Sequence, residues 1–456
     1  MSSTVLSTTQ SVCPVCLERI PASRVAYGRE VYLEKDCPRH GHFKTKIWGG
    51  QLPYEGWANE KIPSAPINGA GVVQRGCPFD CGLCPEHRQH TCCVLLEVTQ
   101  RCSLGCPICY ASAGSPQGQD PSLEDIGQRF DEMMRCGGPF NIQLSGGEPT
   151  EREDLPEIIR MGRERGFTFF QLNTNGLRIA SDKEYLDCLR EAGLDCVFLQ
   201  FDGLRDSTYQ ALRGRPLFEQ KQRAIEACRE AGLGVVLVPV LVPGVNIDEI
   251  GDILRFAFSQ MPTVRGVHFQ PVSYFGRYGI QPPEERFTLS DLLWEIEHQS
   301  GGKLSMEQFS PGGAENAYCS FSGNFIEMED GSLRPWSAPQ SCCCGKPPVA
   351  GQAARKAQKF VARQWSGRRG QSSPKLSSGK PSATASLDAF LDRIDNHSLA
   401  ISSMAFMDAW NLDLERLRDC YIHVVCRREG KVNLIPFCAY NLSSTMGGTL
   451  YRGIQP

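Results

Sequence analysis

Residues 93–110 read CVLLEVTQRCSLGCPICY, and this stretch decides the fold class. Its first seven residues form an apolar run typical of a buried strand, and the polar, glycine-containing segment after it is typical of a loop. The loop places Cys102, Cys106 and Cys109 in a C-x3-C-x2-C pattern directly after the strand. Active sites of β/α barrels lie at the carboxyl ends of their strands. The stretch therefore predicts a barrel with a site built on these three cysteines.

The chain then alternates strand-like and helix-like segments, as a barrel does. Strands are expected at residues 93–99, 140–145, 169–176, 196–203, 234–246 and 266–276. Helical periodicity occupies residues 182–193, 218–232 and 247–260, and the first two of these segments end in a glycine typical of a helix C-cap. Residues 93–275 thus contain six βα units, which gives an α/β fold.

Three thiolates can hold a four-iron cluster and leave one iron without a protein ligand. Such an iron is open to a small molecule, so Cys102, Cys106 and Cys109 are the candidate catalytic residues. A zinc loop with the same spacing is the alternative.

The pattern C-x3-C-x2-C followed by the aromatic residue Tyr110 resembles the signature of the radical S-adenosylmethionine (SAM) superfamily. A strand that ends in Gly146-Gly147-Glu148-Pro149 resembles the GGEP motif of that superfamily, whose backbone and acidic side chain hold the SAM amino group. The resemblance implies a partial (β/α)6 barrel similar to the TIM fold, a SAM-binding [4Fe–4S] cluster and a 5′-deoxyadenosyl radical. A tight turn is the structural alternative for the two glycines.

Further candidate contacts with SAM or substrate lie where predicted strands end. They are Asn173, Thr174, Asn175, Gln200, Asp202 and Gln270. Each of these side chains has the alternative role of capping a turn or a strand end.

A second C-x3-C-x2-C group precedes every predicted barrel strand. It comprises Cys77, Cys81 and Cys84, and Cys92 or Cys93 is expected to close its fourth coordination position. A cluster with four cysteine ligands has no room for SAM and would relay electrons or stabilise the fold. Zinc is the alternative occupant of this site.

The N-terminal segment contains a CPVC knuckle, a motif that aims two sulfurs at one ion. Cys13, Cys16 and Cys37 are expected to bind mononuclear iron or zinc, and the fourth ligand is His40, His42 or a more distant cysteine. A rubredoxin-like or zinc-ribbon module is therefore predicted over residues 10–60.

These flanking motifs, together with the C-terminal cysteines, resemble the multi-cluster group that contains archaeal tetraether lipid synthase and pterin methyltransferase-like radical SAM proteins. The resemblance implies one or two auxiliary [4Fe–4S] clusters. Their expected C-terminal ligands are Cys319, Cys344, Cys420 and Cys438. In the run Cys342-Cys343-Cys344, successive side chains point in different directions and cannot easily all bind one metal, so at least one thiol is expected to be free and redox-active. The run also resembles the TrsS subgroup of radical SAM (seleno)proteins. The alternative is that these cysteines complete an auxiliary cluster with Cys319.

A basic segment follows this run. Residues 346–386 contain nine Lys or Arg and no Asp or Glu, so a flexible linker is expected, with a basic amphipathic helix at residues 353–365 as the alternative. The expected division of the chain is a module at 10–60, an auxiliary-cluster segment at 61–92, the barrel at 93–300, a cysteine-containing extension at 301–345, the linker at 346–386 and a C-terminal cluster-binding region at 387–456.

The composition of the chain bears on its partners and on its location in the cell. The net charge of −3 favours neither a nucleic acid nor a membrane surface, and no apolar run is long enough to span a bilayer. A cytoplasmic location is expected, and in that reducing compartment the 22 cysteines favour metal ligation over disulfides.

The expected activity is hydrogen abstraction from an unactivated carbon, with ferredoxin or flavodoxin as the electron donor. It would lead to C–C coupling, methylation or sulfur chemistry on a lipid or small molecule. A peptide or cofactor maturase whose auxiliary clusters bind substrate is one alternative. A multi-cluster electron carrier without radical chemistry is another.

Overall fold

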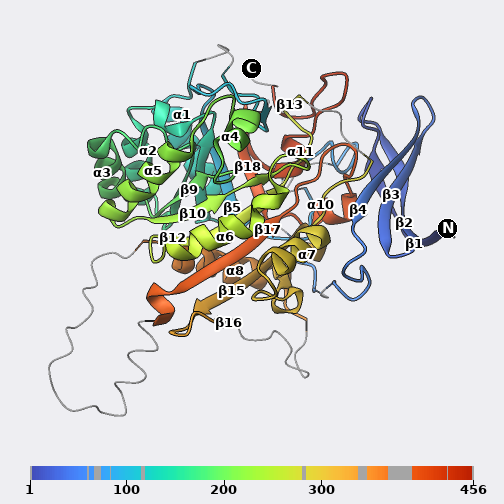
Figure 1. The fold of residues 1–456 in the computed structure, drawn as a ribbon. Helices are drawn as coiled ribbons and strands as arrows, with labels where there is room; N and C mark the ends of the chain where they lie inside the picture. The colour runs from blue at the N-terminus through green and yellow to red at the C-terminus, as the bar shows by residue number, and fades with distance from the viewer. Residues whose placement is uncertain are drawn as a thin grey trace.

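A four-stranded antiparallel sheet forms the N-terminal module of the computed structural model, in the order β1-β2-β3-β4. Its strands are β1 (Ser3–Val12), β2 (Arg19–Tyr27), β3 (Glu30–Cys37) and β4 (Gly41–Trp48). The structure describes residues 3–58, 61–65, 73–82, 84–114, 119–279, 284–336, 347–367, 393–428 and 430–453. The module lies on the side of the molecule away from α1, α2 and α3 (Figure 1).

The predicted barrel strands form one parallel array in the order β12-β10-β9-β8-β7-β5. Their bounds are β5 (Cys93–Thr99), β7 (Asn141–Gly146), β8 (Phe170–Thr174), β9 (Cys196–Gln200), β10 (Gly234–Val238) and β12 (Val264–Pro271). The short strand β11 (Val240–Leu241) pairs with β12. Another short strand, β13 (Arg277–Tyr278), pairs with β6 (Ile108–Cys109). The partial (β/α)6 barrel is confirmed.

Helices cover the outer face of this array (Figure 1). They are α1 (Leu123–Arg135), α2 (Leu155–Glu164), α3 (Lys183–Ala192), α4 (Asp206–Arg213), α5 (Phe218–Ala231), α6 (Ile250–Ser259) and α7 (Leu289–Gln299). The expected C-cap glycines of α3 and α5 are present, since Gly193 and Gly232 have φ angles of 113° and 68°. Outward-facing strand residues such as Val94 and Leu96 pack against these helices in one apolar core.

Later parts of the chain extend the same sheet beyond the six predicted strands. β17 (Ser398–Met404) runs parallel to β12, and β18 (Ile422–Arg428) runs parallel to β5. Antiparallel strands complete both sides, namely β14 (Ser310–Pro311), β15 (Ser320–Glu327), β16 (Leu333–Pro335) and β19 (Lys431–Pro436). The regions expected at 301–345 and 387–456 therefore contribute strands to the sheet of the barrel.

The expected linker is corrected by the structure in its first half. Residues Ala350–Trp365 form helix α8, which packs against β10 and β12 and buries Ala354 and Gln364. Its apolar residues recur at helical spacing, so the segment gains more by covering the barrel than by remaining solvated. The second half of the segment, at 368–386, lies outside the described residues.

The C-terminal helices are short. They are α10 (Leu414–Arg418) and α11 (Phe437–Tyr440). Asp413 caps the first of them, because its side chain accepts a hydrogen bond from the Glu415 amide.

Candidate functional site

The C-x3-C-x2-C loop after β5 is fixed to the turn after β7. The Gly147 amide donates to the Thr99 carbonyl at 2.8 Å, and the Glu148 amide donates to the Arg101 carbonyl at 2.8 Å. Gly146 has a φ of 132°, and a side chain there or at Gly147 would collide with the backbone of Thr99 or Arg101. The two glycines thus permit the close approach of turn and loop.

Cys102, Cys106 and Cys109 line one cavity of about 290 Å³ inside the barrel. Burial raises the pKa of the Cys102 thiol to about 11 and also raises that of Cys106. Metal ions bind the thiolate form of cysteine, whereas the raised pKa values keep these thiols protonated in the empty site. Binding of an iron cluster would therefore release the thiol protons. Three thiols that converge beside a cavity fit a cluster with one accessible iron.

Glu148 is only 3% exposed, and its carboxylate is engaged by the protein itself. One oxygen accepts from the Thr150 amide and hydroxyl and from the Thr174 hydroxyl, and the other accepts from the Asn175 amide at 2.7 Å. Burial nevertheless raises the pKa of Glu148. This side chain joins the ends of β7 and β8.

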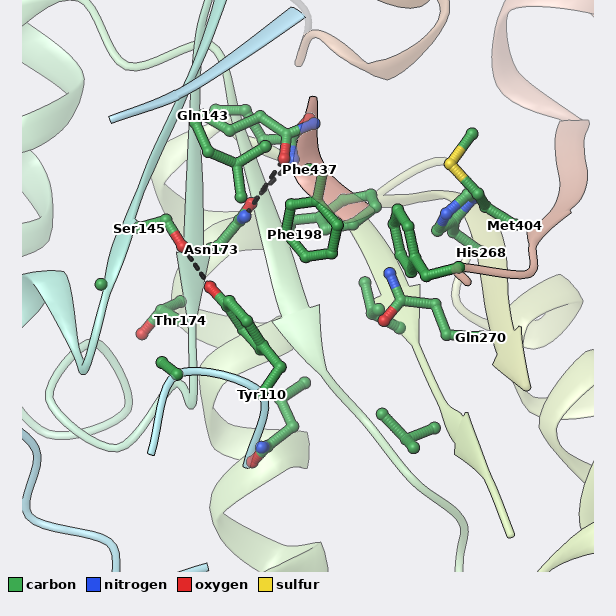
Figure 2. A pocket seen from close by; sticks show the side chains of 18 of the residues that line it. Tyr110, Gln143, Ser145, Asn173, Thr174, Phe198, His268, Gln270, Met404 and Phe437 are labelled. Atoms are coloured by element: carbon green, nitrogen blue, oxygen red, sulfur yellow. Dashed lines mark hydrogen bonds between the residues drawn. The ribbon is translucent and has the colours of Figure 1, made fainter. Parts of the chain in front are cut away.

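Tyr110 follows the third cysteine and packs beneath the cavity. Its hydroxyl lies 2.6 Å from the Ser145 hydroxyl on β7 (Figure 2). Arg452 lies over the Tyr110 ring and forms an ion pair with Glu97 of β5 at 2.5 Å. Tyr110 thereby secures the loop to the barrel interior.

Asp202 does not line the cavity among the described residues and is fully buried. Its two oxygens accept from Arg213 Nε and Nη2, each at 2.7 Å. Arg213 in turn donates to the Ile108 carbonyl at 3.1 Å and contacts the Cys106 thiol. Asp202 therefore positions a guanidinium beside the cysteine loop, although the sequence suggested a direct contact with SAM or substrate.

The other predicted strand-end residues line the cavity. They are Asn173, Thr174, Asn175, Gln200 and Gln270. Asn175 Oδ1 accepts from the Leu177 amide, whereas its buried Nδ2 has no hydrogen-bond partner in the part of the chain that the structure describes. Gln200 Oε1 accepts from Lys221 Nζ at 3.3 Å, and burial lowers the pKa of Lys221 to about 8.

The upstream cysteines Cys77, Cys81 and Cys84 are all buried. The Cys81 amide donates to the Tyr451 hydroxyl at 2.9 Å, and that hydroxyl donates to the Pro78 carbonyl at 2.7 Å. Cys93 lies elsewhere, because it points from β5 into the barrel cavity, where Cys92 also lies. The expectation that Cys93 closes this group is therefore not supported by its position.

A second set comprises Cys319, Cys420 and Cys438, of which Cys438 is buried and the other two are partly buried. Burial raises the pKa of Cys420 and of Cys438, and the nearby Cys319 raises both pKa values further through charge repulsion. Arg416 Nε and Nη2 both lie 3.4 Å from Cys319 Sγ. Cys344, with Cys342 and Cys343, lies outside the described residues.

The N-terminal donors converge as predicted, and the structure selects the fourth. One ligand atom from each of Cys13, Cys16, Cys37 and His40 lies within 4.8 Å of the others. His42 instead pairs with Asp36 at the surface. Three sulfurs and one nitrogen at such separations suit a single tetrahedral ion.

Comparisons with known proteins agree with this arrangement. The profile described as the radical SAM superfamily matches residues 96–257, and the profile described as the HMPTM N-terminal zinc ribbon domain matches residues 5–49. The chain belongs to the radical SAM superfamily and is an enzyme.

Within that superfamily, the chain is 35% identical to 7,8-dihydro-6-hydroxymethylpterin dimethyltransferase of Methanocaldococcus jannaschii, over 95% of this chain and 93% of that protein. It is 33% identical to a probable GTP 3′,8-cyclase of Methanothermobacter marburgensis over 38% of this chain and 56% of that protein. The predicted relationship to pterin methyltransferase-like radical SAM proteins is confirmed.

Solved structures show a more distant likeness. The crystal structure of Streptococcus suis SuiB bound to precursor peptide SuiA aligns with a TM-score of 0.39 and 16% identity, over 47% of this chain and 46% of SuiB. Within the residues that the structure describes, no helix is both long and apolar enough to cross a membrane.

Sequence reasoning missed several residues that the structure brings to the site. Arg213, Gln143, Gln171, His268 and Trp365 all line the cavity. For Gln143, Gln171 and His268 a signal existed, since each is a polar residue at an inward-facing position of a predicted strand. Trp365 lay in the expected linker and had no such signal.

Proposed function

We propose that this chain cleaves SAM reductively to a 5′-deoxyadenosyl radical, which abstracts a hydrogen atom during the methylation of a carbon of a dihydropterin-type small molecule. A second molecule of SAM, or another one-carbon donor, supplies the methyl group. The observation that carries the proposal is the 35% identity, over nearly the whole length, to 7,8-dihydro-6-hydroxymethylpterin dimethyltransferase. The cavity beside the three cysteines supports it, because that cavity contains both the cysteine loop and the polar side chains that a small molecule needs.

Cys102, Cys106 and Cys109 would hold a [4Fe–4S] cluster in the part of the cavity that they line. When bound, that cluster supplies the electron that breaks the SAM sulfonium bond and yields a 5′-deoxyadenosyl radical. Arg213 holds a positive charge against Cys106, where it favours thiolate over thiol. Tyr110 keeps the loop in place through Ser145.

The turn after β7 would receive the amino group of SAM. Since the Glu148 carboxylate already accepts four hydrogen bonds, backbone carbonyls of Gly146 and Gly147 are the acceptors that we assign to that ammonium. Asn175 Nδ2, a buried donor without a partner among the described residues, would donate to an acceptor of SAM such as its carboxylate.

The two further cysteine sets would hold auxiliary [4Fe–4S] clusters. Cys77, Cys81 and Cys84 form one set, and Cys319, Cys420 and Cys438 form the other. These clusters would carry electrons from ferredoxin or flavodoxin. The ribbon site would hold mononuclear zinc, as the description of its matching profile supports.

The cavity favours a small molecule over a lipid. Its volume of about 290 Å³ lies at the lower end of the range for small-molecule pockets, and carboxamides from β7, β8, β9 and β12 line it. A long alkyl chain would leave the acceptors and donors that these amides do not pair among themselves, such as Gln171 Oε1, without hydrogen bonds, at a cost of roughly 1–3 kcal/mol for each unpaired group.

Anaerobic incubation of the reconstituted, reduced protein with SAM tests the proposal. We expect 5′-deoxyadenosine and methionine, with a higher yield when 7,8-dihydro-6-hydroxymethylpterin is added, and a pterin product heavier by one or two methyl groups. SAM that carries an isotope in its methyl group will show whether SAM also donates that carbon. Failure to form 5′-deoxyadenosine from protein with its full iron content would contradict the proposal.

A further inference from the structure

Helix α8 closes the end of the barrel opposite the cysteine loop. Asn141, the first residue of β7, donates through Nδ2 to the Gln358 carbonyl at 3.0 Å. Arg265, near the start of β12, donates through Nε to the Gln364 carbonyl at 3.1 Å. Because these contacts involve the amino ends of the strands, the helix lies across the bottom of the barrel, and Trp365 lines the cavity from there.

Trp365 forms an aromatic group with Phe198 of β9 and His268 of β12. The Phe198 ring centroid lies 5.4 Å from that of Trp365 and 5.4 Å from that of His268. His268 Nδ1 is 2.9 Å from the Ser402 hydroxyl of β17, which fixes the orientation of its ring. These three rings, called here the aromatic floor, line the deep end of the cavity and are tilted against one another by 34° to 63°.

A row of three carboxamides lies beside the aromatic floor. Gln171 Nε2 donates to Asn173 Oδ1 at 2.8 Å, and Asn173 Nδ2 donates to Gln143 Oε1 at 3.3 Å (Figure 2 shows the second bond). Asn173 is the register partner of Phe198 on the adjacent strand, so the row and the floor are neighbours.

The carboxamide row ends in an acceptor without a partner. Gln171 is only 1% exposed, and its Oε1 has no hydrogen-bond partner in the described part of the chain. A buried, unpaired carbonyl oxygen is costly to the empty protein and is satisfied when a donor binds there. Gln171 also lines the cavity, so a small rotation of its carboxamide would present Oε1 to a donor on a molecule inside it.

We propose that the aromatic floor and the carboxamide row form the substrate-binding subsite, and that they select a flat heteroaromatic ring with an N–H donor on its edge. The ring lies against Trp365, Phe198 and His268, and its donor edge satisfies Gln171 Oε1. This inference rests on the proposed function, since it places the pterin-type substrate in the cavity that the three cysteines border.

The subsite also accounts for selectivity by size. Trp365 comes from α8, outside the strand array, and it occupies the space through which a longer molecule would have to extend. Replacement of this one residue would therefore deepen the cavity while leaving the cysteine loop unchanged.

Equilibrium binding of 7,8-dihydro-6-hydroxymethylpterin to the full-length, reconstituted protein tests the inference. Gln171→Leu keeps the size of the side chain but removes the acceptor, and we expect it to weaken binding by about 10-fold or more. Gln171→Glu keeps an acceptor oxygen and, when protonated, a donor to Asn173 Oδ1, so it should retain more binding than Gln171→Leu. Trp365→Ala should weaken binding by about 10-fold or more, whereas Trp365→Phe should retain most of it. Lys356→Ala, an exposed change on the same helix, is the matched control.

Two outcomes would overturn the inference. One is no measurable pterin binding to the unaltered protein, and the other is equal binding by the unaltered protein and both Gln171→Leu and Trp365→Ala. Formation of 5′-deoxyadenosine without pterin is measured in the same samples. If that reaction is absent while binding depends on Gln171 and Trp365, the proposed function fails and the subsite stands; if it is present while binding is insensitive, the subsite fails alone.

Discussion

The loops at residues 77–84 and 102–109 have the same C-x3-C-x2-C spacing but different surroundings. The later loop borders a cavity of about 290 Å³ and is held by the glycine turn after β7. In the earlier loop all three cysteines are buried, and Tyr451 covers the loop through a hydrogen bond to the Cys81 amide. Spacing allows both loops to hold a cluster, and the surroundings decide which cluster a small molecule can reach.

The two loops also differ in the cation beside them. Arg213 is 5% exposed and is held by the fully buried Asp202 near Cys106. Arg418 near Cys77 is 25% exposed and pairs with Glu86 and Glu415 at a partly solvated position. A buried pair acts strongly on its neighbours, whereas an exposed pair is screened by water.

The strongest test of the comparison replaces one cysteine in each loop. Cys106→Ala should abolish 5′-deoxyadenosine formation, because it removes a ligand of the cluster that SAM reaches. Cys81→Ala should leave slow SAM cleavage when a chemical reductant replaces the electron relay. Chromatographic quantification of 5′-deoxyadenosine checks both variants, and the reverse pattern would show that the two roles have been exchanged.

A second test addresses the cations. Arg213→Gln leaves the Asp202 carboxylate buried without its partner, so we expect the free energy of unfolding to fall by about 3–5 kcal/mol. The double variant Asp202→Asn, Arg213→Gln should recover part of this loss. Arg418→Gln, the matched change at the earlier loop, should cost about 1 kcal/mol or less. Anaerobic denaturant unfolding measures all three, and equal losses at Arg213 and Arg418 would contradict the distinction.

A third test, with a smaller effect than the loss of Cys106 or Arg213, addresses the cover of the earlier loop. Tyr451→Phe removes the hydroxyl that joins the Cys81 amide and the Pro78 carbonyl, at a cost of about 1–3 kcal/mol in the free energy of unfolding. The variant should retain SAM cleavage with a chemical reductant. Loss of that cleavage would mean that the cover of the earlier loop controls the later one.

The sequence was sufficient for the barrel and the SAM loop because both depend on local patterns. The apolar run before Cys102, the glycine turn at residues 146–147 and the C-cap glycines Gly193 and Gly232 each act within a few residues. In the ribbon the sequence predicted Cys13, Cys16 and Cys37 but left the fourth ligand open, and the structure selected His40, whose ring nitrogen lies 3.4 Å from the Cys37 sulfur.

The features that the sequence did not predict depend on contacts between segments that are far apart in the chain. Asp202 was expected to contact SAM or substrate, yet Arg213 on the following helix binds it, and sequence spacing does not reveal that pair. Cys93 was expected beside Cys84, but the alternation of side chains along β5 turns it into the barrel. Helix α8 was mistaken for linker because its basic exposed face outweighed its narrow apolar face in composition.

The pairing of β17 with β12 and of β18 with β5 has a consequence for how the protein is made. Without these two strands, the six-stranded array would expose its unpaired backbone along β5 and β12. Exposed strand edges recruit other chains, and contacts between residues far apart in sequence form slowly. A nascent chain that ends before residue 398 should therefore aggregate, so barrel folding has to await the synthesis of the C-terminal strands.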